Sequence, residues 1–249
     1  MQGAVTQAMI FAAGLGQRMR PLTEHTPKPL IEVAGRPIID HALQRLRAQG
    51  VRRVVVNMHW LGEQIARWAA RQPAPPEIIV SDERERLLDT GGGLKKALAH
   101  FAPAPLFAVN GDSIWLDGPT PALAGLQSAW DEARMDILLL TVDPARAVGH
   151  GGGVDFTREA DGRLRRAEAG GAGEIFTGVY LLHPRLFAAA PDGPFSMNRL
   201  FDRAMTAGRL FGLPHDGRWL HVGTPQAIPE AERIMRQHDK EAHPPADAS

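Results

Sequence analysis

One stretch, residues 9–30, constrains the fold of this chain more than any other. It opens with a short apolar run that ends at Gly14 and Gly16, which predicts a buried strand over residues 8–13 leading into a tight turn. Three prolines follow within the same stretch, so no long helix can come directly after the turn. The stretch therefore predicts a strand followed by an ordered loop.

Cationic side chains accompany these glycines. Arg18 follows the turn, and Lys28 stands between two prolines. Glycines let backbone N–H groups approach a phosphate chain, while arginine offers a planar fork and lysine a point charge to the same oxygens. The residues predict a binding loop for a triphosphate. For Gly14 and Gly16 alone, an ordinary turn with solvent-facing basic residues is the alternative.

Two common phosphate-binding loops do not match this stretch. The dinucleotide fingerprint requires a third glycine where Met19 stands, followed at once by a helix. A P-loop requires Gly-Lys-Ser or Gly-Lys-Thr after a four-residue spacer, and no such run follows Gly14 or Gly16. The predicted loop is therefore of another kind.

The apolar periodicity after this stretch alternates between helical and strand spacing. Helices are expected over residues 37–49, 61–71, 122–132, 195–207 and 225–237, and strands over residues 53–57, 78–80, 106–109, 136–142 and 209–213. This alternation is typical of a parallel sheet with helices on both faces. After residue 143, short strands and glycine turns favour antiparallel pairing.

A threonine followed by three glycines begins at Thr90. Consecutive glycines before a helix predict that backbone amides and the helix N-terminus lie against a flat or anionic group. A plain helix N-cap by Thr90 is the alternative. The charged residues 81–86 before it predict a solvated loop.

Asp112 is the best candidate for a metal ligand. It follows an apolar strand, and ligands of open α/β sheets bind at the carboxyl ends of strands. Its carboxylate suits Mg²⁺, which prefers oxygen and neutralises phosphate charge. A simple turn residue is the alternative. Asp143 ends a later strand on the same side and is a weaker candidate for contact with a substrate.

The order of these motifs resembles the signature of sugar-1-phosphate nucleotidyltransferases. The matching segments are residues 11–14, 16–23, 27–30 and 35–39. In that family the glycine loop and its arginine hold the nucleoside triphosphate, and the lysine touches the phosphates at the reacting centre. The resemblance assigns these roles to Gly14, Gly16, Gln17, Arg18 and Lys28.

The resemblance implies further roles along the chain. A glycine turn at Thr90, Gly91 and Gly92 would pack on the base and ribose of the nucleotide. Asp112 would bridge the metal and the nucleotide, with Asn110 touching the substrates beside it. Thr177 and Gly178 match the strand that carries a sugar-binding glycine.

Two departures from the family pattern stand out. The family's Glu-Lys-Pro motif for the sugar and its phosphate is absent, since Ala169 follows Glu168, so the cationic partner of the sugar phosphate is left open. The family's Trp-x-Asp-x-Gly-Thr-Pro has His221 in place of the aspartate, usually the second metal ligand. His221 would bind a softer cation such as Mn²⁺, contact a phosphate or metal-bound water, or be a core histidine.

For the whole chain the resemblance implies a Rossmann-like three-layer α/β/α sandwich around a mixed, mainly parallel sheet. One domain is expected over residues 1–237, with a nucleotide-binding half at 8–142, a sugar-binding half at 143–237 and a disordered tail at 238–249. The enzyme would transfer a nucleotidyl group from a nucleoside triphosphate to a sugar 1-phosphate with Mg²⁺ or Mn²⁺.

Within the family, the combination of Thr-Gly-Gly-Gly, Asn-Gly-Asp and a short chain most resembles the N-acetylmuramate 1-phosphate uridylyltransferases of cell-wall recycling. This resemblance predicts UTP and N-acetylmuramic acid 1-phosphate as substrates. Mannose or heptose phosphate with GTP, glucose phosphate with TTP, and a non-catalytic sugar-nucleotide sensor are the alternatives.

Composition restricts the other functions. Lys plus Arg and Asp plus Glu both number 28, so no basic field for nucleic acid is expected. The absence of cysteine excludes disulfides, thiolate metal sites and a cysteine nucleophile. The first residues predict neither a signal peptide nor a membrane span, so a cytoplasmic location is expected, and nothing in the sequence indicates a protein partner.

Overall fold

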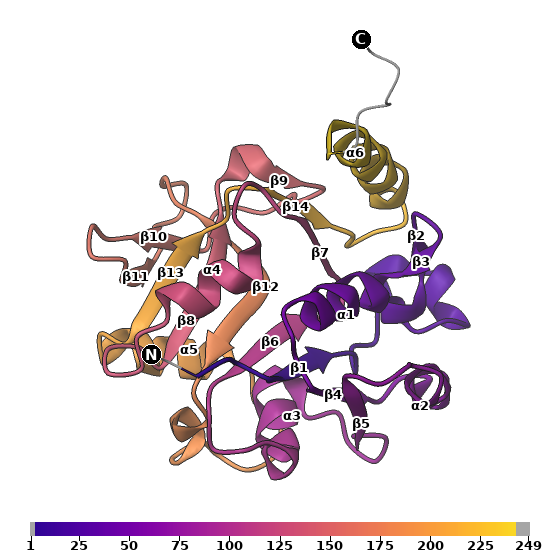
Figure 1. Cartoon of the computed structure of the whole chain (residues 1–249), viewed down its shortest axis with the longest axis horizontal. Helices are drawn as coiled ribbons and strands as arrows, with labels where there is room; N and C mark the ends of the chain where they lie inside the picture. The colour runs from indigo at the N-terminus through magenta and orange to yellow at the C-terminus, as the bar shows by residue number, and fades with distance from the viewer. Residues whose placement is uncertain (1–2, 243–249) are drawn as a thin grey trace.

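The structure is a computed structural model that describes residues 3–242, and a seven-stranded sheet lies at its centre (Figure 1). In spatial order the strands are β13 (Leu210–Pro214), β8 (Ile137–Val142), β12 (Ile175–Leu182), β6 (Leu106–Asn110), β1 (Gln7–Phe11), β4 (Arg53–Met58) and β5 (Glu77–Asp82). Only β12 runs antiparallel to its two neighbours in this sheet. The expected mixed, mainly parallel sheet is therefore confirmed.

Helices cover both faces of the sheet because its strands are apolar on both sides. In β1, Ala8 and Ile10 pack into one core cluster and Met9 into the other, and the neighbouring strands alternate in the same way. The first cluster holds side chains of α1 (Ile38–Ala48), α2 (Gly62–Ala70) and α4 (Ala122–Ala129). The second holds side chains of α3 (Asp89–Ala97) and α5 (Asn198–Thr206). These are the three layers of the expected sandwich.

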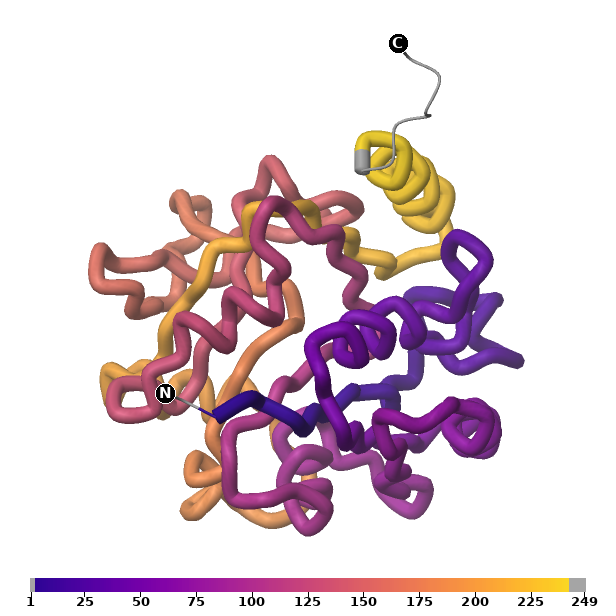
Figure 2. Tube along the Cα trace, in the orientation of Figure 1, coloured from indigo at the N-terminus to yellow at the C-terminus, as the bar shows by residue number. Residues whose placement is uncertain are grey.

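A smaller sheet stands beside the large one. It consists of β7 (Ser113–Leu116), β14 (Arg218–His221) and β9 (Ala147–Val148), and α6 (Ala227–Ala242) packs against it through a third core cluster. Two hairpins, β2 (Glu32–Val33) with β3 (Arg36–Pro37) and β10 (Phe156–Arg158) with β11 (Leu164–Arg166), complete the strands. In Figure 2 the purple part of the trace lies at the right and the pink and orange part at the left, and the yellow C-terminal helix returns to the upper right.

Most expected elements are present with displaced ends, and three expectations need correction. Helix α4 ends at Ala129 because the backbone turns extended at Trp130. Helix α6 continues to Ala242, so the disordered tail expected from residue 238 is wrong up to that point, and residues 243–249 lie outside the described part. The solvated loop expected over residues 81–86 is wrong at Glu83, which is only 1% exposed.

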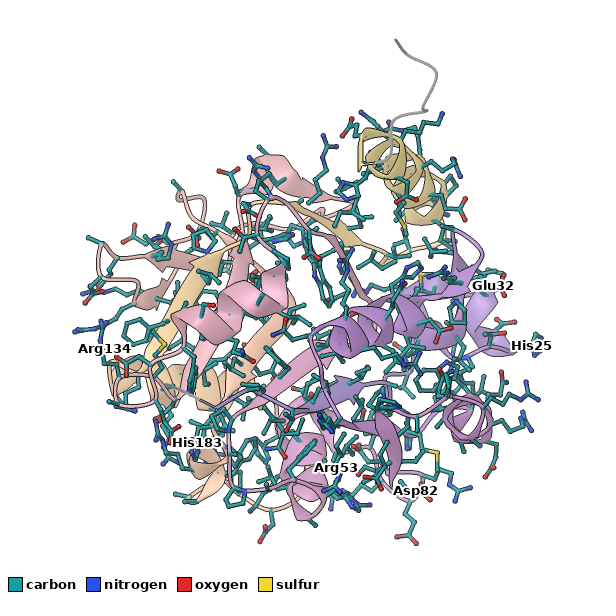
Figure 3. The ribbon with its side chains drawn as sticks, in the orientation of Figure 1. His25, Glu32, Arg53, Asp82, Arg134 and His183 are labelled. Atoms are coloured by element: carbon teal, nitrogen blue, oxygen red, sulfur yellow. The ribbon has the colours of Figure 1, made fainter. Side chains whose placement is uncertain are left out.

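Charged side chains lie around the periphery. Figure 3 shows exposed His25 and Glu32 at one rim and exposed Arg134 at the opposite rim. No helix within residues 3–242 is long and apolar enough to cross a membrane.

Candidate active site

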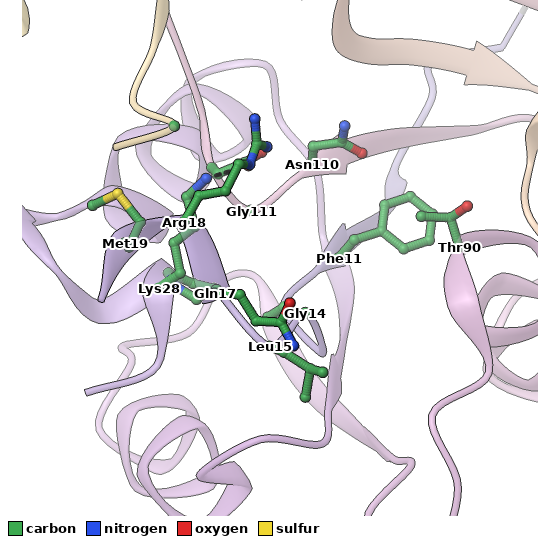
Figure 4. A pocket seen from close by; sticks show the side chains of 15 residues that line it. Phe11, Gly14, Leu15, Gln17, Arg18, Met19, Lys28, Thr90, Asn110 and Gly111 are labelled. Atoms are coloured by element: carbon green, nitrogen blue, oxygen red, sulfur yellow. Dashed lines mark hydrogen bonds and ion pairs between the residues drawn. The ribbon is translucent and has the colours of Figure 1, made fainter. Parts of the chain in front are cut away.

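A cavity of about 640 Å³ opens where β1 and β6 end (Figure 4). Its lining comes from the loop after β1, from the loop around Lys28, from the start of α3 and from the segment after β6. Because β1 and β6 are parallel neighbours, their carboxyl ends meet at one edge of the sheet. The motifs singled out in the sequence are thereby brought into one cavity.

The glycine loop has the geometry of an anion site. Gly16 has a φ of 64°, and a Cβ there would lie 2.7 Å from Cγ2 of Thr23, so another residue would be both strained and crowded. The Thr23 hydroxyl donates to the Gly16 carbonyl at 2.8 Å and fixes the loop. Within residues 3–242, the N–H groups of Gly14, Leu15 and Gly16 have no hydrogen-bond partner, and Arg18 forms no ion pair.

Lys28 and Asp112 form an ion pair on the wall of the cavity. The Lys28 ammonium donates to Oδ2 of Asp112 at 2.7 Å, and the two side chains are 10% and 30% exposed. Burial by itself raises the pKa of Asp112, but the Lys28 charge and hydrogen bond, with a contribution from His221, hold that pKa below its usual range. Asp112 is thus ionised, and Lys28 keeps two N–H groups for another acceptor.

Close backbone approaches position Asn110 and Asp112. The N–H of Gly111 donates to the Phe11 carbonyl at 2.8 Å, and a Cβ at Gly111 would overlap that carbonyl. This contact joins the ends of β6 and β1. Gly178 has a φ of 79°, and a Cβ there would lie 2.7 Å from Nδ2 of Asn110. The bulge in β12 at Gly178 therefore makes room for the Asn110 side chain.

The cavity brings together eight of the residues predicted from sequence and leaves six outside its lining. The eight lining residues are Gly14, Gly16, Gln17, Arg18, Lys28, Thr90, Asn110 and Asp112. The six others are Gly91, Gly92, Asp143, Thr177, Gly178 and His221.

The glycines after Thr90 contact another segment of the protein itself. They lie within the first turn of α3, and the N–H groups of Gly91 and Gly92 donate to the Phe195 carbonyl at 2.8 and 3.0 Å. A Cβ at Gly91 would overlap the Phe195 ring, and one at Gly92 would overlap the Gly193 carbonyl. The glycines thus fit α3 against this segment, and neither of them lines the cavity. Thr90 is not an N-cap either.

Asp143 and Thr177 also have structural partners. Asp143 accepts a hydrogen bond from the Ala145 N–H at 2.8 Å and caps a short 3₁₀ turn. Thr177 is fully buried, and its hydroxyl donates to the Leu140 carbonyl at 2.8 Å. Neither residue borders the cavity, so their expected contact with the sugar finds no support in the geometry.

His221 lies beside the ion pair but behind the lining. It ends β14 opposite Ser113, the residue after Asp112. Burial lowers the pKa of His221, although the Asp112 carboxylate opposes this shift. Gly223 lines the cavity at this point, and a Cβ there would overlap the imidazole.

A buried polar network, which the sequence motifs did not indicate, supports the loop from behind. Oδ1 of Asn57 accepts from the Ala12 N–H at 2.7 Å, and Nδ2 of Asn57 donates to Glu83 at 2.7 Å. The second Glu83 oxygen accepts from the Leu88 N–H at 3.0 Å. The network joins the start of the glycine loop to the start of α3. In the sequence Glu83 was hidden within a charged run.

A second cavity of about 300 Å³ adjoins the first, since both are lined by Thr90 and Asn110. Its other lining residues come from α3, β10 and the residue before it, β11, β12, and α5 with the segment leading into it. The sequence indicated β12 through Thr177 and Gly178, but it did not indicate these residues themselves, which are scattered along the chain. Together the two cavities offer space for two substrates side by side.

Comparison with known proteins agrees with this geometry. Residues 8–191 match the MobA-like NTP transferase domain. The chain is 43% identical over 241 residues to the N-acetylmuramate alpha-1-phosphate uridylyltransferase of Caulobacter vibrioides, covering 95% of this chain and 100% of that protein. It is 35% identical to the protein of the same name from Neisseria meningitidis, covering 92% of this chain and 97% of the other.

A solved structure shares the fold at low identity. The inositol-1-phosphate CTP transferase of T. maritima superposes with a TM-score of 0.74 at 19% identity, over 96% of this chain and 98% of that one. The structural neighbour supports the sandwich fold, and the domain match over residues 8–191 includes the glycine loop and the ion pair. This chain belongs to the sugar-1-phosphate nucleotidyltransferases with a MobA-like NTP transferase domain, and it is a nucleotidyltransferase enzyme.

Proposed function

We propose that the enzyme transfers the uridylyl group of UTP to N-acetylmuramic acid α-1-phosphate, forming UDP-N-acetylmuramic acid and releasing pyrophosphate. The observation that carries this proposal is the 43% identity over the whole length of the Caulobacter vibrioides protein of that name. The reaction belongs in the cytoplasm, where nucleoside triphosphates are made. Its product would return muramic acid to cell-wall synthesis.

The larger cavity takes the nucleotide. Gly14, Leu15 and Gly16 have N–H groups without partners among the described residues, and these groups and Arg18 are suited to the β- and γ-phosphates. Lys28 then lies at the α-phosphate, where its remaining N–H groups stabilise the charge that develops during transfer. The uridine extends toward Thr90.

The sugar phosphate takes the smaller cavity. Asn110 borders both cavities, so its amide lies where the two phosphates meet. An oxygen of the sugar phosphate attacks the α-phosphorus in line, and pyrophosphate leaves. Because that phosphate is already ionised, the chain needs to position and neutralise the groups and no strong general base is required.

The residues fit a magnesium ion held mainly by substrate oxygens. Among residues 3–242 there is no cluster of three or more His, Cys, Asp or Glu side chains able to hold a metal alone. Mg²⁺ is commonly bound by one or two carboxylates together with substrate phosphates, and Asp112 is ionised and borders the cavity. We propose Asp112 as the ligand, with His221 available for a softer ion such as Mn²⁺. The bound metal would neutralise phosphate charge.

Pyrophosphate release tests the proposal. The purified protein is incubated with Mg²⁺ or Mn²⁺, and UTP, TTP, GTP and CTP are each combined with the 1-phosphates of N-acetylmuramic acid, N-acetylglucosamine, glucose and mannose. The expected result is release that is fastest with UTP and N-acetylmuramic acid 1-phosphate.

Faster pyrophosphate release with another pair would show that the proposed substrates are wrong, although the proposed type of reaction would stand. Binding of UTP with no release from any pair would overturn the enzymatic function and favour a sugar-nucleotide sensor. In that case His221→Asp, which restores the family's aspartate, would be expected to gain activity.

A further inference from the structure

The smaller cavity has an aromatic floor and a polar rim. Phe176, Tyr180 and Phe201 meet edge to face, with ring centroids 5.5 to 5.7 Å apart. Tyr180 is 1% exposed and lines this cavity.

Arg166 is the only cationic side chain among the described residues that line this cavity. It lies on β11 with its guanidinium over the Phe156 ring, 4.8 Å from the ring centroid. Its Nε and Nη2 donate to Asp202 at 3.0 and 2.8 Å, and Nη2 also donates to Asn198 at 3.1 Å. These contacts hold the guanidinium in place.

The Arg166 guanidinium retains unused donors. Within the described part of the chain Nη1 has no hydrogen-bond partner, which leaves two N–H groups for a ligand. The two carboxylates that line the cavity accept hydrogen bonds from backbone N–H groups. Asp155 accepts from the Phe176 N–H at 2.8 Å, and Asp89 accepts from the Thr90 N–H at 2.6 Å. A second negative group in the cavity would therefore be drawn to Arg166 and repelled by the two aspartates.

We infer that Arg166 binds the carboxylate of an acidic sugar and thereby determines which sugar 1-phosphate is used. The inference rests on the proposed function, in which the sugar carries a lactyl ether on C3, two ring carbons from the phosphate-bearing C1. The phosphate lies at the junction beside Asn110, and the lactyl carboxylate extends into the smaller cavity to Nη1 of Arg166. N-acetylglucosamine 1-phosphate lacks only this lactyl group, so the residue selects between the two sugars.

Kinetics on this substrate pair tests the inference. Arg166→Gln removes the charge, and we expect kcat/KM for N-acetylmuramic acid 1-phosphate to fall about 10- to 100-fold, the effect of losing a hydrogen bond to a charged group. We expect kcat/KM for N-acetylglucosamine 1-phosphate to change less than about threefold. Arg166→Lys keeps the charge without the planar fork and should give an intermediate loss confined to the acidic sugar. Arg165→Gln, the neighbouring arginine with a side chain 76% exposed, is the matched control and should change neither value.

Calorimetric titration of both sugar phosphates into each protein separates the inference from the proposed function. If wild type releases no pyrophosphate yet binds the muramic acid phosphate more tightly, and Arg166→Gln loses that preference, then the proposed function fails and the inference stands. If Arg166→Gln loses affinity equally for both sugar phosphates, Arg166 holds a group that they share, such as the phosphate, and the inference is overturned. The inference is also overturned if wild type binds both sugar phosphates equally well.

Discussion

Gly14 and Gly16 lie two residues apart in the glycine loop, but a side chain would be tolerated differently at the two positions. Gly16 combines a positive φ with crowding, because a Cβ there would lie 2.7 Å from Cγ2 of Thr23, whereas a Cβ at Gly14 would meet nothing within 4 Å. Gly16→Ala is therefore expected to lower the free energy of unfolding by about 1–3 kcal/mol. Urea unfolding measures this loss.

Gly14→Ala is the matched variant for the same loop. We expect its free energy of unfolding to equal that of wild type within about 0.5 kcal/mol. Its affinity for UTP should fall, because the methyl group stands where the phosphates approach the loop. Unchanged UTP affinity, measured by calorimetry, would show that the phosphates do not lie against Gly14.

Lys28 acts on both the substrate and Asp112. Lys28→Met keeps most of the length of the side chain and removes its charge. We expect kcat/KM to fall about 100- to 1000-fold, the usual cost of losing one group that stabilises charge in the transition state. The pKa of Asp112 should rise as well, because burial is then opposed by fewer positive groups.

Arg20→Met is the control for this variant, since Arg20 is an exposed cation of the same loop outside the cavity lining. Steady-state pyrophosphate release by both variants gives the comparison. Equal losses in the two would mean that the loop needs general positive charge and no specific lysine.

Single residues were predictable from sequence where a motif carried them. Arg18 and Lys28 belong to the loop motif, Asp112 combines a motif with a strand end, and all three line the cavity. The sequence was less informative at Gly91, because a glycine indicates that something approaches closely but does not say what approaches. In the structure the ring and the carbonyl of Phe195 lie against it.

At the scale of elements, the Asn57 and Glu83 network holds four segments together. It joins the loop after β1, β4, the end of β5 and the start of α3. Burial raises the pKa of Glu83 above its ordinary value of 4.5. The folded state therefore binds more protons than the unfolded state between these two pKa values, and the free energy of unfolding falls as pH rises through that interval.

Glu83→Gln removes this titration. As pH rises from about 4 to 7, wild type should lose free energy of unfolding relative to the variant, because only wild type carries the Glu83 titration. Glu85→Gln, at an exposed glutamate two residues along, should show no such shift. Denaturant unfolding at a series of pH values gives the comparison, and parallel curves for wild type and Glu83→Gln would contradict the assignment.

The sequence predicted whether a segment is a helix or a strand better than it predicted where the segment ends. Strands such as β1 and β8 are apolar on both faces, so their burial between two helical layers follows from the sequence. The end of α4 and the length of α6 depend on tertiary packing that local periodicity does not report. Glu83 likewise lies in a charged run, and its burial depends on Asn57 and Gly93, which lie outside that run.

At the scale of the whole molecule, one reversed strand accounts for the two adjoining cavities. β12 runs antiparallel to β6, so its first residues lie at the edge where β6 ends. Phe176 and Asn110 therefore border the same smaller cavity. The parallel half of the sheet was readable from its strand and helix rhythm. The smaller cavity was not, because its lining comes from segments that meet only in the folded chain.

The larger cavity couples nucleotide binding to global stability. A ligand that binds only the folded state adds a stabilisation set by its concentration relative to its Kd, and UTP at 100 times its Kd should add about 2.7 kcal/mol. For a chain of 249 residues this corresponds to a rise in Tm of about 5–11 °C. Uridine at the same concentration leaves Arg18 and Lys28 without phosphates to bind, so its shift should be much smaller. Thermal unfolding with each ligand measures this difference, and equal shifts would mean that the base, and not the triphosphate, supplies most of the binding energy.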